Sequence, residues 1–315
     1  MGTTLITGVG LVGTSFAQYA LKRSEKLVFF DFMPRVDYLH KKLGAANVDV
    51  VQKDVRDLPA LIEAMQKHRP ETVVHTAGLI GPRVVESLYT GLQINVMGTI
   101  NVLEAARLSG VKRFVLISTF GAYDRRRFTD QPVNEDMARG PGAGYGNSKA
   151  SKELMAEAYS RLYGFELMVL RLANAYGLGH FWGGSGGGEK VQTLLEAGIK
   201  GNVAKIPQAQ TMDFEYIYAK DMGRGVDLAA TVPMPEQNIF NIGVGKVTSF
   251  EELVGTAEKL LPNLQVEIMP GRPPDTAVSV PLDISRAKKY LGWEPQFTME
   301  AAFEDYIKDL KAVMD

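Results

Sequence analysis

Short apolar runs alternate with longer amphipathic stretches through the first half of the chain. The runs at 4–7, 27–30, 48–52, 72–75, 114–118 and 167–171 have the length and the residue types of buried strands. The stretches 84–109 and 145–163 are long enough for helices of several turns. Strands that alternate with helices in this way predict a doubly wound α/β fold, in which helices cover both faces of a parallel sheet.

The first predicted strand leads into a glycine-rich turn, Gly8-Val9-Gly10-Leu11-Val12-Gly13, and then into a helical stretch. Glycines let the backbone turn sharply, and the new helix points free N–H groups and its positive dipole end at phosphates. The second strand ends at Asp31, where a carboxylate can accept hydrogen bonds from the adenosine ribose hydroxyls. Asp31 would repel a 2′-phosphate, so this Rossmann-type half predicts NAD over NADP. Arg35 is the one nearby residue that argues for NADP.

Several candidate residues lie at the ends of the predicted strands. Right-handed crossovers place Gly8, Asp31, Asp54, Ala77 and Ser118 along one edge of the sheet. Ligands bind at this edge in open α/β sheets. The candidate site residues therefore converge in space.

Tyr145 and Lys149 lie four residues apart on a predicted helix. Residues at this spacing share a helix face, so we expect the Lys149 ammonium to lie near the Tyr145 phenol and to favour its ionised form. A phenol with an ordinary pKa of about 10 is a poor proton acceptor at neutral pH. The same spacing also occurs on the solvated edges of many helices. Together with the glycine turn, however, the pair predicts a dinucleotide-dependent redox enzyme.

The composition describes a soluble enzyme of 315 residues with a formal net charge of −1. This charge gives no electrostatic footprint for nucleic acid, and we interpret Arg125-Arg126-Arg127 as a solvated loop. There are no cysteines, and the four histidines lack metal-ligand spacing, so we expect neither disulfides nor a metal. We see no signal-peptide pattern and no apolar run that could span a bilayer, so we expect a cytoplasmic protein with no membrane partner.

The regular alternation of predicted strands and helices ends after residue 171. A glycine-dense stretch at 177–188, shorter elements and a proline-rich segment at 270–281 follow. We predict an NAD-binding Rossmann domain at 1–171 and a smaller, mainly substrate-binding lobe at 172–315, with parts of 211–243 returning to the first domain. Loops of this kind commonly carry substrate contacts. Phe181 and Trp182 within the glycine-dense stretch would either stack on a ligand or anchor the loop.

The order of the motifs resembles that of an extended short-chain dehydrogenase/reductase of the NAD-dependent epimerase/dehydratase family, similar to UDP-glucose 4-epimerase-like enzymes. The resemblance covers nearly the whole chain. Besides the glycine turn and Asp31, it rests on Asp54-Val55-Arg56-Asp57, His75-Thr76-Ala77-Gly78, Asn95-Val96-Met97-Gly98-Thr99, Ser118-Thr119 with Tyr123, Arg171-Leu172-Ala173-Asn174-Ala175-Tyr176-Gly177, Asp283-Ile284-Ser285-Arg286-Ala287, and Leu291-Gly292-Trp293 with Pro295.

The resemblance implies roles for individual residues. Tyr145 would accept the proton of a substrate secondary alcohol as hydride leaves for the nicotinamide. Lys149 would stabilise the phenolate and hold the ribose, and Thr119 would orient the alcohol oxygen. Thr119, Asn174 and Arg272 would bind the substrate. The remaining implied cofactor contacts are Asp54 (to the adenine amino group), Val55, Ala77, Gly78, Asn95 and Ser118, together with Tyr145 and Lys149.

Three departures from the family bear on the substrate. Gly8 and Gly10 are one residue closer together than is usual, which we interpret as a local variant of the phosphate turn. Phe120 and Gly121 stand where dehydratases carry an acidic pair, so we do not expect a dehydratase. Met212 stands where sugar-nucleotide members carry an arginine that grips the substrate diphosphate, and methionine cannot replace that contact.

Three functions follow from these observations. The first is a sugar or sugar-nucleotide epimerase that transfers hydride reversibly at a secondary alcohol of a carbohydrate-type substrate. The second, which Met212 favours, is an NAD-dependent dehydrogenase that acts on a small sugar acid, polyol or other alcohol and releases NADH. The third is a non-catalytic NAD-binding sensor.

The resemblance also implies a homodimer packed through the helices at 84–109 and 145–163. In the alternative, the apolar residues of these two helices only cover the sheet. These residues include Leu88, Leu92, Val96, Leu103, Leu154 and Tyr159.

Overall fold

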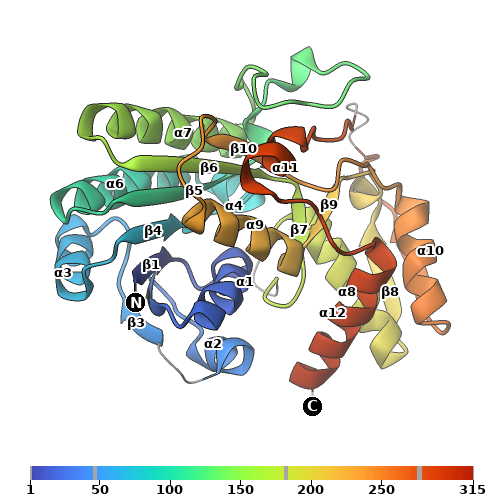
Figure 1. The fold of residues 1–315 in the computed structure, drawn as a ribbon. Helices are drawn as coiled ribbons and strands as arrows, with labels where there is room; N and C mark the ends of the chain where they lie inside the picture. Colours follow the sequence, from blue (N-terminus) through green and yellow to red (C-terminus); the bar gives the residue numbers. More distant parts are fainter. Residues whose placement is uncertain (1, 45–47, 181–183, 275–278, 315) are drawn as a thin grey trace.

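The computed structural model of the protein describes residues 2–44, 48–180, 184–274 and 279–314 (Figure 1). Phe181, Trp182 and residues 275–278 of the proline-rich segment lie outside the described residues. Within the described part, the main sheet has seven strands in the order β10-β6-β5-β4-β1-β2-β3, and every neighbouring pair is parallel. The strands are β1 (Thr3–Thr7), β2 (Lys26–Asp31), β3 (Val48–Gln52), β4 (Thr72–His75), β5 (Arg113–Thr119), β6 (Glu166–Leu172) and β10 (Ile239–Ile242).

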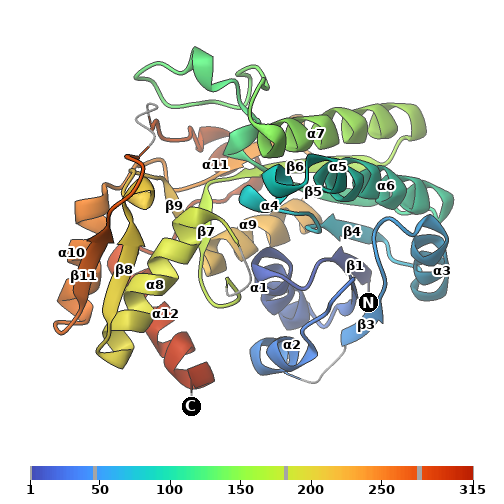
Figure 2. The same ribbon diagram turned by 180° about the vertical axis from the view of Figure 1, so that it is seen from behind.

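Helices cover both faces of this sheet, as the pattern of apolar runs predicts. Figures 1 and 2 show the two faces. One face carries α1 (Leu11–Ala20), α2 (Val36–Leu43) and α9 (Ala219–Thr231), and the other carries α3 (Leu58–His68), α6 (Gly98–Leu108) and α7 (Gly144–Tyr163). The doubly wound α/β class is therefore confirmed.

Strand β5 shows why its apolar run is continuous. Successive side chains of a strand point to opposite faces of the sheet. Val115 and Ile117 join one buried cluster, which includes α1 and α9. Phe114 and Leu116 join the other cluster, with α3 and α6. Because both faces are covered, every position of the strand is buried, and the sequence has no polar alternation there.

The stretch 84–109 does not form the single helix that its periodicity predicts. The chain forms α4 (Pro82–Glu86), α5 (Leu88–Leu92), a π-helical turn at Gln93–Met97 and then α6. The break is at Ser87, whose backbone is extended at φ −145° and ψ 89°. A Cβ on Gly91 would lie 2.8 Å from the side chain of Val84, so close packing between α4 and α5 accompanies the break. Apolar spacing continues across such a break and does not reveal it.

The second lobe contains two small parallel sheets. β7 (Asn174–Tyr176) pairs with β9 (Tyr216–Tyr218), and β8 (Val203–Pro207) pairs with β11 (Gln265–Met269). Its helices are α8 (Gly186–Lys200), α10 (Phe250–Leu260) and α12 (Met299–Met314), whereas α11 (Ser285–Leu291) packs near β10. After β9 the chain returns to the main sheet, where α9 packs against α1 and β10 pairs with β6. The division into domains at 1–171 and 172–315 stays a prediction.

The glycine-dense stretch 177–188 is not a loop throughout, because α8 begins at Gly186. Ser185 caps this helix, and its hydroxyl accepts a hydrogen bond of 3.2 Å from the Gly188 N–H. A Cβ on Gly188 would lie 2.5 Å from the Ala175 carbonyl oxygen. Glycine at this position therefore permits close packing of the first turn of α8, although its helix propensity is low.

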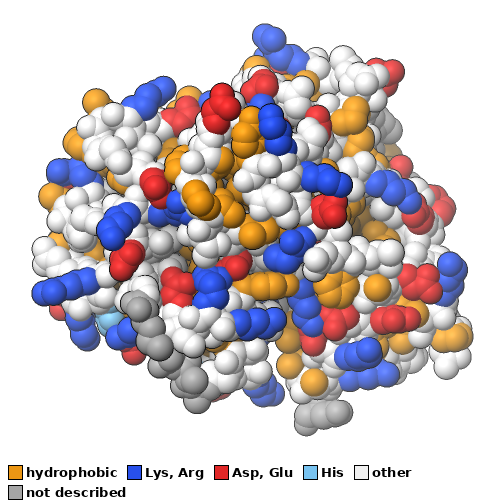
Figure 3. All heavy atoms as spheres, in the orientation of Figure 1, with side chains coloured by type: hydrophobic (Ala, Val, Ile, Leu, Met, Phe, Trp, Pro, Cys, Tyr) orange, Lys and Arg blue, Asp and Glu red, His pale blue; other side chains and the backbone are white. Residues whose placement is uncertain are grey.

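Acidic and basic side chains are interspersed over the face shown in Figure 3. The chain as a whole has a formal net charge of −1. Among the described residues, none of the helices combines the length and the apolar character needed to cross a bilayer.

Candidate active site

The glycine turn joins β1 to α1 at the carboxyl edge of the sheet. Gly8 has a φ of 94°, and a Cβ there would lie 2.6 Å from the Thr76 hydroxyl. A Cβ on Gly13 would lie 2.5 Å from the Gly8 carbonyl oxygen. A Cβ on Gly10, by contrast, would have no neighbour within 4 Å, and Gly10 is the N-cap of α1, without a side-chain cap hydrogen bond. The first turn of the helix, with Leu11 and Val12, thus offers backbone N–H groups to an anion.

Asp31 lies at the end of β2, next to this turn. One carboxylate oxygen accepts a hydrogen bond of 2.7 Å from the Val9 N–H, and the other accepts one of 2.7 Å from the Met33 N–H. A carboxylate has about four lone-pair sites, so both oxygens keep capacity for hydroxyl donors. Donors for a pyrophosphate and acceptors for a ribose therefore lie side by side, and the residues present fit a dinucleotide.

Asp54 and Val55 follow β3. Arg56 holds the Asp54 carboxylate in a bidentate pair: its Nε donates to Oδ1 at 3.0 Å and its Nη2 donates to Oδ2 at 2.6 Å. The hydrogen bond from Arg56 lowers the pKa of Asp54 and outweighs its burial. An adenine amino group at Asp54 would thus share the carboxylate with Arg56. Val55 packs against Gly98, where a Cβ would lie 2.7 Å from the Val55 side chain.

Asn95 ties the segment after β4 to α7. Its amide oxygen accepts a hydrogen bond of 2.7 Å from the Leu79 N–H, and its amide nitrogen donates to the Leu79 carbonyl at 3.0 Å. The same nitrogen also donates to the Ser148 hydroxyl at 3.0 Å. Asn95 is fully buried within the π-helical turn. This side chain therefore fixes the position of the Ala77–Gly78 segment relative to the helix that carries Tyr145.

The structure brings Thr119, Tyr145 and Lys149 together where the end of β5 meets helix α7. The Thr119 side chain lies near enough to the Tyr145 phenol to lower its pKa against the effect of burial. The Lys149 ammonium lies 5.7 Å from the centre of the Tyr145 ring and donates a hydrogen bond of 3.0 Å to the Ile117 carbonyl. Thr119 ends β5, and α7 packs against β5, so the sheet and one helix position the whole trio.

The protonation of Tyr145 differs from the expectation. Burial raises the pKa of Tyr145 to about 12, and the Thr119 side chain opposes this only in part. Burial also lowers the pKa of Lys149 to about 8, against the charge of Glu153. Lys149 was expected to favour the phenolate, but in the protein without cofactor the burial of the phenol decides the direction of the pKa shift.

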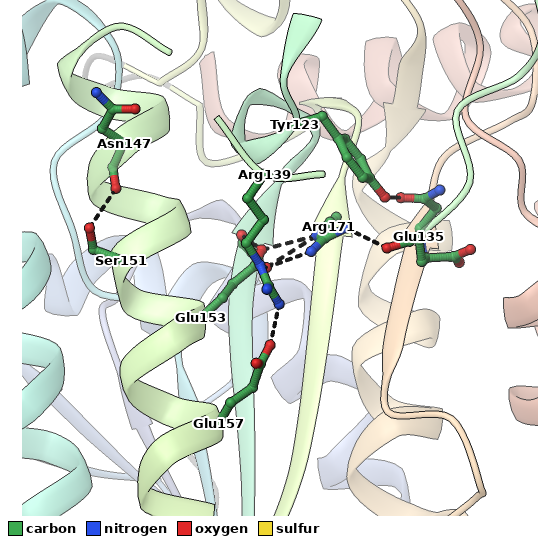
Figure 4. Close-up of polar contacts among 10 residues, drawn as sticks. Tyr123, Glu135, Arg139, Asn147, Ser151, Glu153, Glu157 and Arg171 are labelled. Carbon is green, nitrogen blue, oxygen red and sulfur yellow. Dashed lines mark hydrogen bonds and ion pairs between the residues drawn. The ribbon is translucent and has the colours of Figure 1, made fainter. Parts of the chain in front are cut away.

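A buried ionic network anchors helix α7, which carries Tyr145 and Lys149, to strands β5 and β6 (Figure 4). The Glu153 carboxylate accepts hydrogen bonds from Arg171 at 2.7 Å and from Arg139 at 2.6 Å. Ser118 also donates a hydrogen bond to Glu153, and Arg139 pairs with Glu157 one turn further along. Glu153 is fully buried and Arg171 is 1% exposed. The network therefore locks the helix that carries Tyr145 and Lys149 to the sheet.

Sequence reasoning missed Glu153, although it follows Lys149 by four residues on the same helix face. Figure 4 also shows Arg171 reaching a second segment, where it donates to the Glu135 carbonyl at 3.0 Å. Tyr123, which the resemblance places in the serine/threonine region, donates to Asn241 on β10 at 2.6 Å.

Two of the three predicted substrate residues, Asn174 and Arg272, lie on the second lobe, whereas Thr119 ends β5 of the main sheet. Asn174 begins β7, is buried, and donates a hydrogen bond of 3.3 Å to the Glu215 carbonyl. Arg272 is exposed on the segment after β11. The Met212 carbonyl accepts a hydrogen bond of 3.0 Å from Lys190, which also donates to the Gln210 carbonyl at 2.7 Å.

Lys190 is a further residue that sequence reasoning missed. It is 1% exposed on α8, and its ammonium faces the rings of Phe214, Tyr216 and Phe250 at 5.0, 5.7 and 5.3 Å. Burial lowers its pKa to about 8. No motif signals this lysine, because its partners are backbone carbonyls and ring faces that only the fold brings together.

Comparison with known proteins shows the family of this chain. Residues 4–243 match the NAD dependent epimerase/dehydratase family. The chain is 29% identical to the UDP-glucose 4-epimerase of Mycolicibacterium smegmatis over 94% of both chains. It is 28% identical to the UDP-glucuronate 4-epimerase of Thermodesulfobacterium geofontis, over 95% of this chain and 93% of the relative.

Solved structures show the same fold. The UDP-glucose 4-epimerase of Thermotoga maritima with UDP-glucose superposes with a TM-score of 0.86 at 24% identity, over 99% of this chain and 100% of that one. The UDP-glucose 4-epimerase of Thermus thermophilus in complex with NAD also gives 0.86 at 24% identity, over 98% and 99%. The chain is thus an enzyme of the extended short-chain dehydrogenase/reductase type that uses NAD, and it belongs to the NAD-dependent epimerase/dehydratase family.

Proposed function

We propose that the protein is an NAD-dependent epimerase that inverts a secondary-alcohol carbon of a sugar-nucleotide substrate. The observation that carries this proposal is the grouping of Thr119, Tyr145 and Lys149 at the edge of the parallel sheet that also carries the glycine turn. Likeness to two 4-epimerases over more than nine-tenths of the chain supports the choice of reaction.

In the proposed reaction Tyr145 exchanges a proton with the substrate hydroxyl, and Thr119 holds the same hydroxyl oxygen. A buried phenol with a pKa of about 12 holds its proton at neutral pH, so the base must be activated within the complete site. Bound NAD supplies the hydride acceptor and, through its positive nicotinamide ring, a charge that favours the phenolate. Lys149 adds a second charge 5.7 Å from the ring centre. The network around Glu153 keeps these groups in register.

A specific observation keeps an NAD-dependent dehydrogenase as the second candidate. An epimerase must hold its substrate by a group far from the reacting carbon while the keto intermediate rotates in the site. Met212 offers no charge for a diphosphate, and the ammonium of Lys190 is directed inward at two carbonyl oxygens. Of the two cations that the resemblance implies for a substrate diphosphate, only Arg272 is then present. A dehydrogenase of a small sugar acid or polyol does not need to hold its substrate in this way.

The first experiment measures the dinucleotide retained by the purified protein after gel filtration without added cofactor. An epimerase is expected to retain close to one NAD per chain and to interconvert the 4-epimers of UDP-glucose or UDP-glucuronate. Empty protein that forms free NADH from sugar acids or polyols would replace the proposal with the second candidate.

Tyr145→Phe tests the catalytic assignment. The change removes only the hydroxyl, so we expect a turnover lower by about 10²–10⁴-fold with NAD still bound. Unchanged turnover would refute the role of Tyr145, and an absence of turnover in the unaltered protein with all these substrates would favour an NAD-binding sensor.

We also propose that two copies of the chain pair through α4, α5 and α7. Val85 is 64% exposed, Tyr89 78% and Leu162 74%, so these helices carry apolar side chains that the sheet does not bury. α5 lies beside α7, because a Cβ on Gly144 would lie 2.8 Å from the Leu88 side chain. Sedimentation velocity is expected to show a dimer that Tyr89→Glu converts to monomer. A monomer of the unaltered protein at micromolar concentration would refute the pairing.

A further inference from the structure

Lys152 is a buried amine directly behind the Ala77–Gly78 segment. It follows Lys149 by three residues on α7 and is 1% exposed. Its Nζ lies 3.4 Å from the Ala77 carbonyl oxygen and 3.9 Å from the place of a Cβ on Gly78. A Cβ on Gly8 would in turn lie 3.2 Å from the Ala77 backbone nitrogen. One short segment of chain therefore separates the Lys152 amine from the phosphate turn.

The surroundings of Lys152 provide little to balance a positive charge. Its own helix presents Lys149, and β4 presents His75, whose ring nitrogens contact the Thr7 and Thr99 hydroxyls at 2.6 and 2.8 Å. The carboxylate next to Lys152 in sequence, Glu153, accepts its hydrogen bonds from Arg171, Arg139 and Ser118. In the described part of the chain, the single hydrogen bond assigned to the Lys152 amine is the long one to Ala77.

These surroundings favour the neutral amine. Burial lowers the pKa of Lys152 well below its ordinary value of 10.5, and the like charge of Lys149 lowers it further. A buried lysine without a carboxylate partner gives up its proton rather than carry an uncompensated charge. Lys152 and Lys149 also lower the pKa of the fully buried His75, after burial itself. The region behind Ala77 is therefore short of negative charge.

A dinucleotide on the glycine turn brings the two negative charges of its pyrophosphate to the other side of the same segment. A nearby negative charge stabilises an ammonium, and the effect is strong where little water screens it. We propose that the Lys152 amine takes up one proton from solvent when NAD binds, which couples retention of the cofactor to pH. The step is amine plus proton to ammonium, and no other bond changes. The inference rests on the proposed position of NAD along the glycine turn and the Ala77–Gly78 segment.

The coupling has a defined sign. Because the proton binds more tightly in the complex than in the free protein, NAD affinity falls as pH rises between the two pKa values, by up to about tenfold per pH unit. A fixed positive charge or an apolar side chain at position 152 cannot change protonation. Either one removes this part of the pH dependence.

Isothermal titration of NAD into the full chain, after any retained dinucleotide has been removed, measures the protons taken up. The titration is done at one pH in phosphate and in Tris, because the two buffers have different ionisation enthalpies. Lys152→Met is expected to lower proton uptake by close to one relative to the unaltered protein. Lys152→Arg, which stays charged, is expected to do the same, and Lys205→Met on the exposed edge of β8 is expected to change nothing. Circular dichroism checks that each variant is folded, and if one is not, the other supplies the comparison.

Each result bears on a different claim. Equal proton uptake by the unaltered protein and by a folded Lys152 variant would overturn the coupling while leaving NAD binding intact. Failure of the unaltered chain, freed of dinucleotide and still folded, to bind NAD would overturn the proposed function, and the coupling with it.

Discussion

Replacing Glu153 by glutamine removes the charge that offsets the buried Arg171 guanidinium and leaves the shape of the side chain almost unchanged. Arg171 donates hydrogen bonds of 2.7 and 3.1 Å to the two carboxylate oxygens and is 1% exposed. Removing one partner of a buried pair costs about 3–5 kcal/mol, because the other charge stays buried without compensation. We therefore expect Glu153→Gln to lower the free energy of unfolding by that amount.

The size of the chain converts this loss into a temperature. At about 2.1 cal/mol/K per residue, a chain of 315 residues has an unfolding entropy of about 0.66 kcal/mol/K. A loss of 3–5 kcal/mol then lowers Tm by about 5–8 °C. Glu157→Gln is the matched control, since Glu157 lies one turn away on the same helix and pairs with Arg139 at a side chain that is 20% exposed. We expect the control to lose about 1 kcal/mol or less.

Urea unfolding followed by circular dichroism measures both variants, and its pH dependence adds a second check. Burial alone would raise the pKa of Glu153, but the hydrogen bonds and charge of Arg171, with Ser118 and Arg139, hold it below its ordinary value of 4.5. A carboxylate with a depressed pKa in the folded state stabilises the protein above its unfolded pKa, and that stability is lost as pH falls through the folded pKa. The difference between the unaltered protein and Glu153→Gln should therefore be full above pH 4.5 and shrink below it.

Two results would refute this reasoning. The first is a Glu153→Gln variant that loses no more stability than Glu157→Gln. The second is a double variant, Glu153→Gln with Arg171→Met, that is less stable than Glu153→Gln alone. Removal of the stranded guanidinium should restore part of the loss.

Three further outcomes are expected. Gly13→Ala should weaken NAD binding and cost about 1–3 kcal/mol of stability, since its Cβ would lie 2.5 Å from the Gly8 carbonyl oxygen, and calorimetry with urea unfolding measures both. Asp31→Ser should raise the affinity for NADP relative to NAD, because it removes the carboxylate that repels a 2′-phosphate, and an unchanged ratio of the two dissociation constants would contradict this. Ser249→Ala should cost about 1 kcal/mol, because it removes the cap that accepts a 3.1 Å hydrogen bond from the Glu252 N–H, and an unchanged urea midpoint would count against it.

Six of the seven strands of the main sheet are predicted by sequence, because turn-forming or polar residues flank their apolar runs, whereas β10 (Ile239–Ile242) was not predicted as a strand. β3 and β4 have the predicted bounds, 48–52 and 72–75. The single helix expected at 84–109 is broken at Ser87, where Val84 packs closely against Gly91. The spacing of apolar residues continues across this break and does not reveal it. Local patterns thus predict which segments form elements, whereas breaks within a helix depend on the neighbours that the fold supplies.

The candidate site likewise has features that the sequence predicts and features that only the fold creates. Tyr145, Lys149 and Thr119 are predictable, since a helix and a strand end bring them together. The raised pKa of Tyr145 is not, because burial of a phenol is a property of the assembled fold. Lys152 and Lys190 are likewise invisible in the sequence, where lysine ordinarily indicates an exposed position.

The place of β10 at the edge of the main sheet has a consequence for synthesis on the ribosome. β6 ends at Leu172 and its partner β10 ends at Ile242, so 70 residues must be added before the sheet can be completed. At about 5–20 residues per second this takes about 4–14 s. Through that interval β6 is an open edge strand with its apolar side chains and backbone donors in place, which is the kind of surface that pairs with other chains. We therefore expect the nascent protein to be open to pairing with other chains while its second lobe is being made.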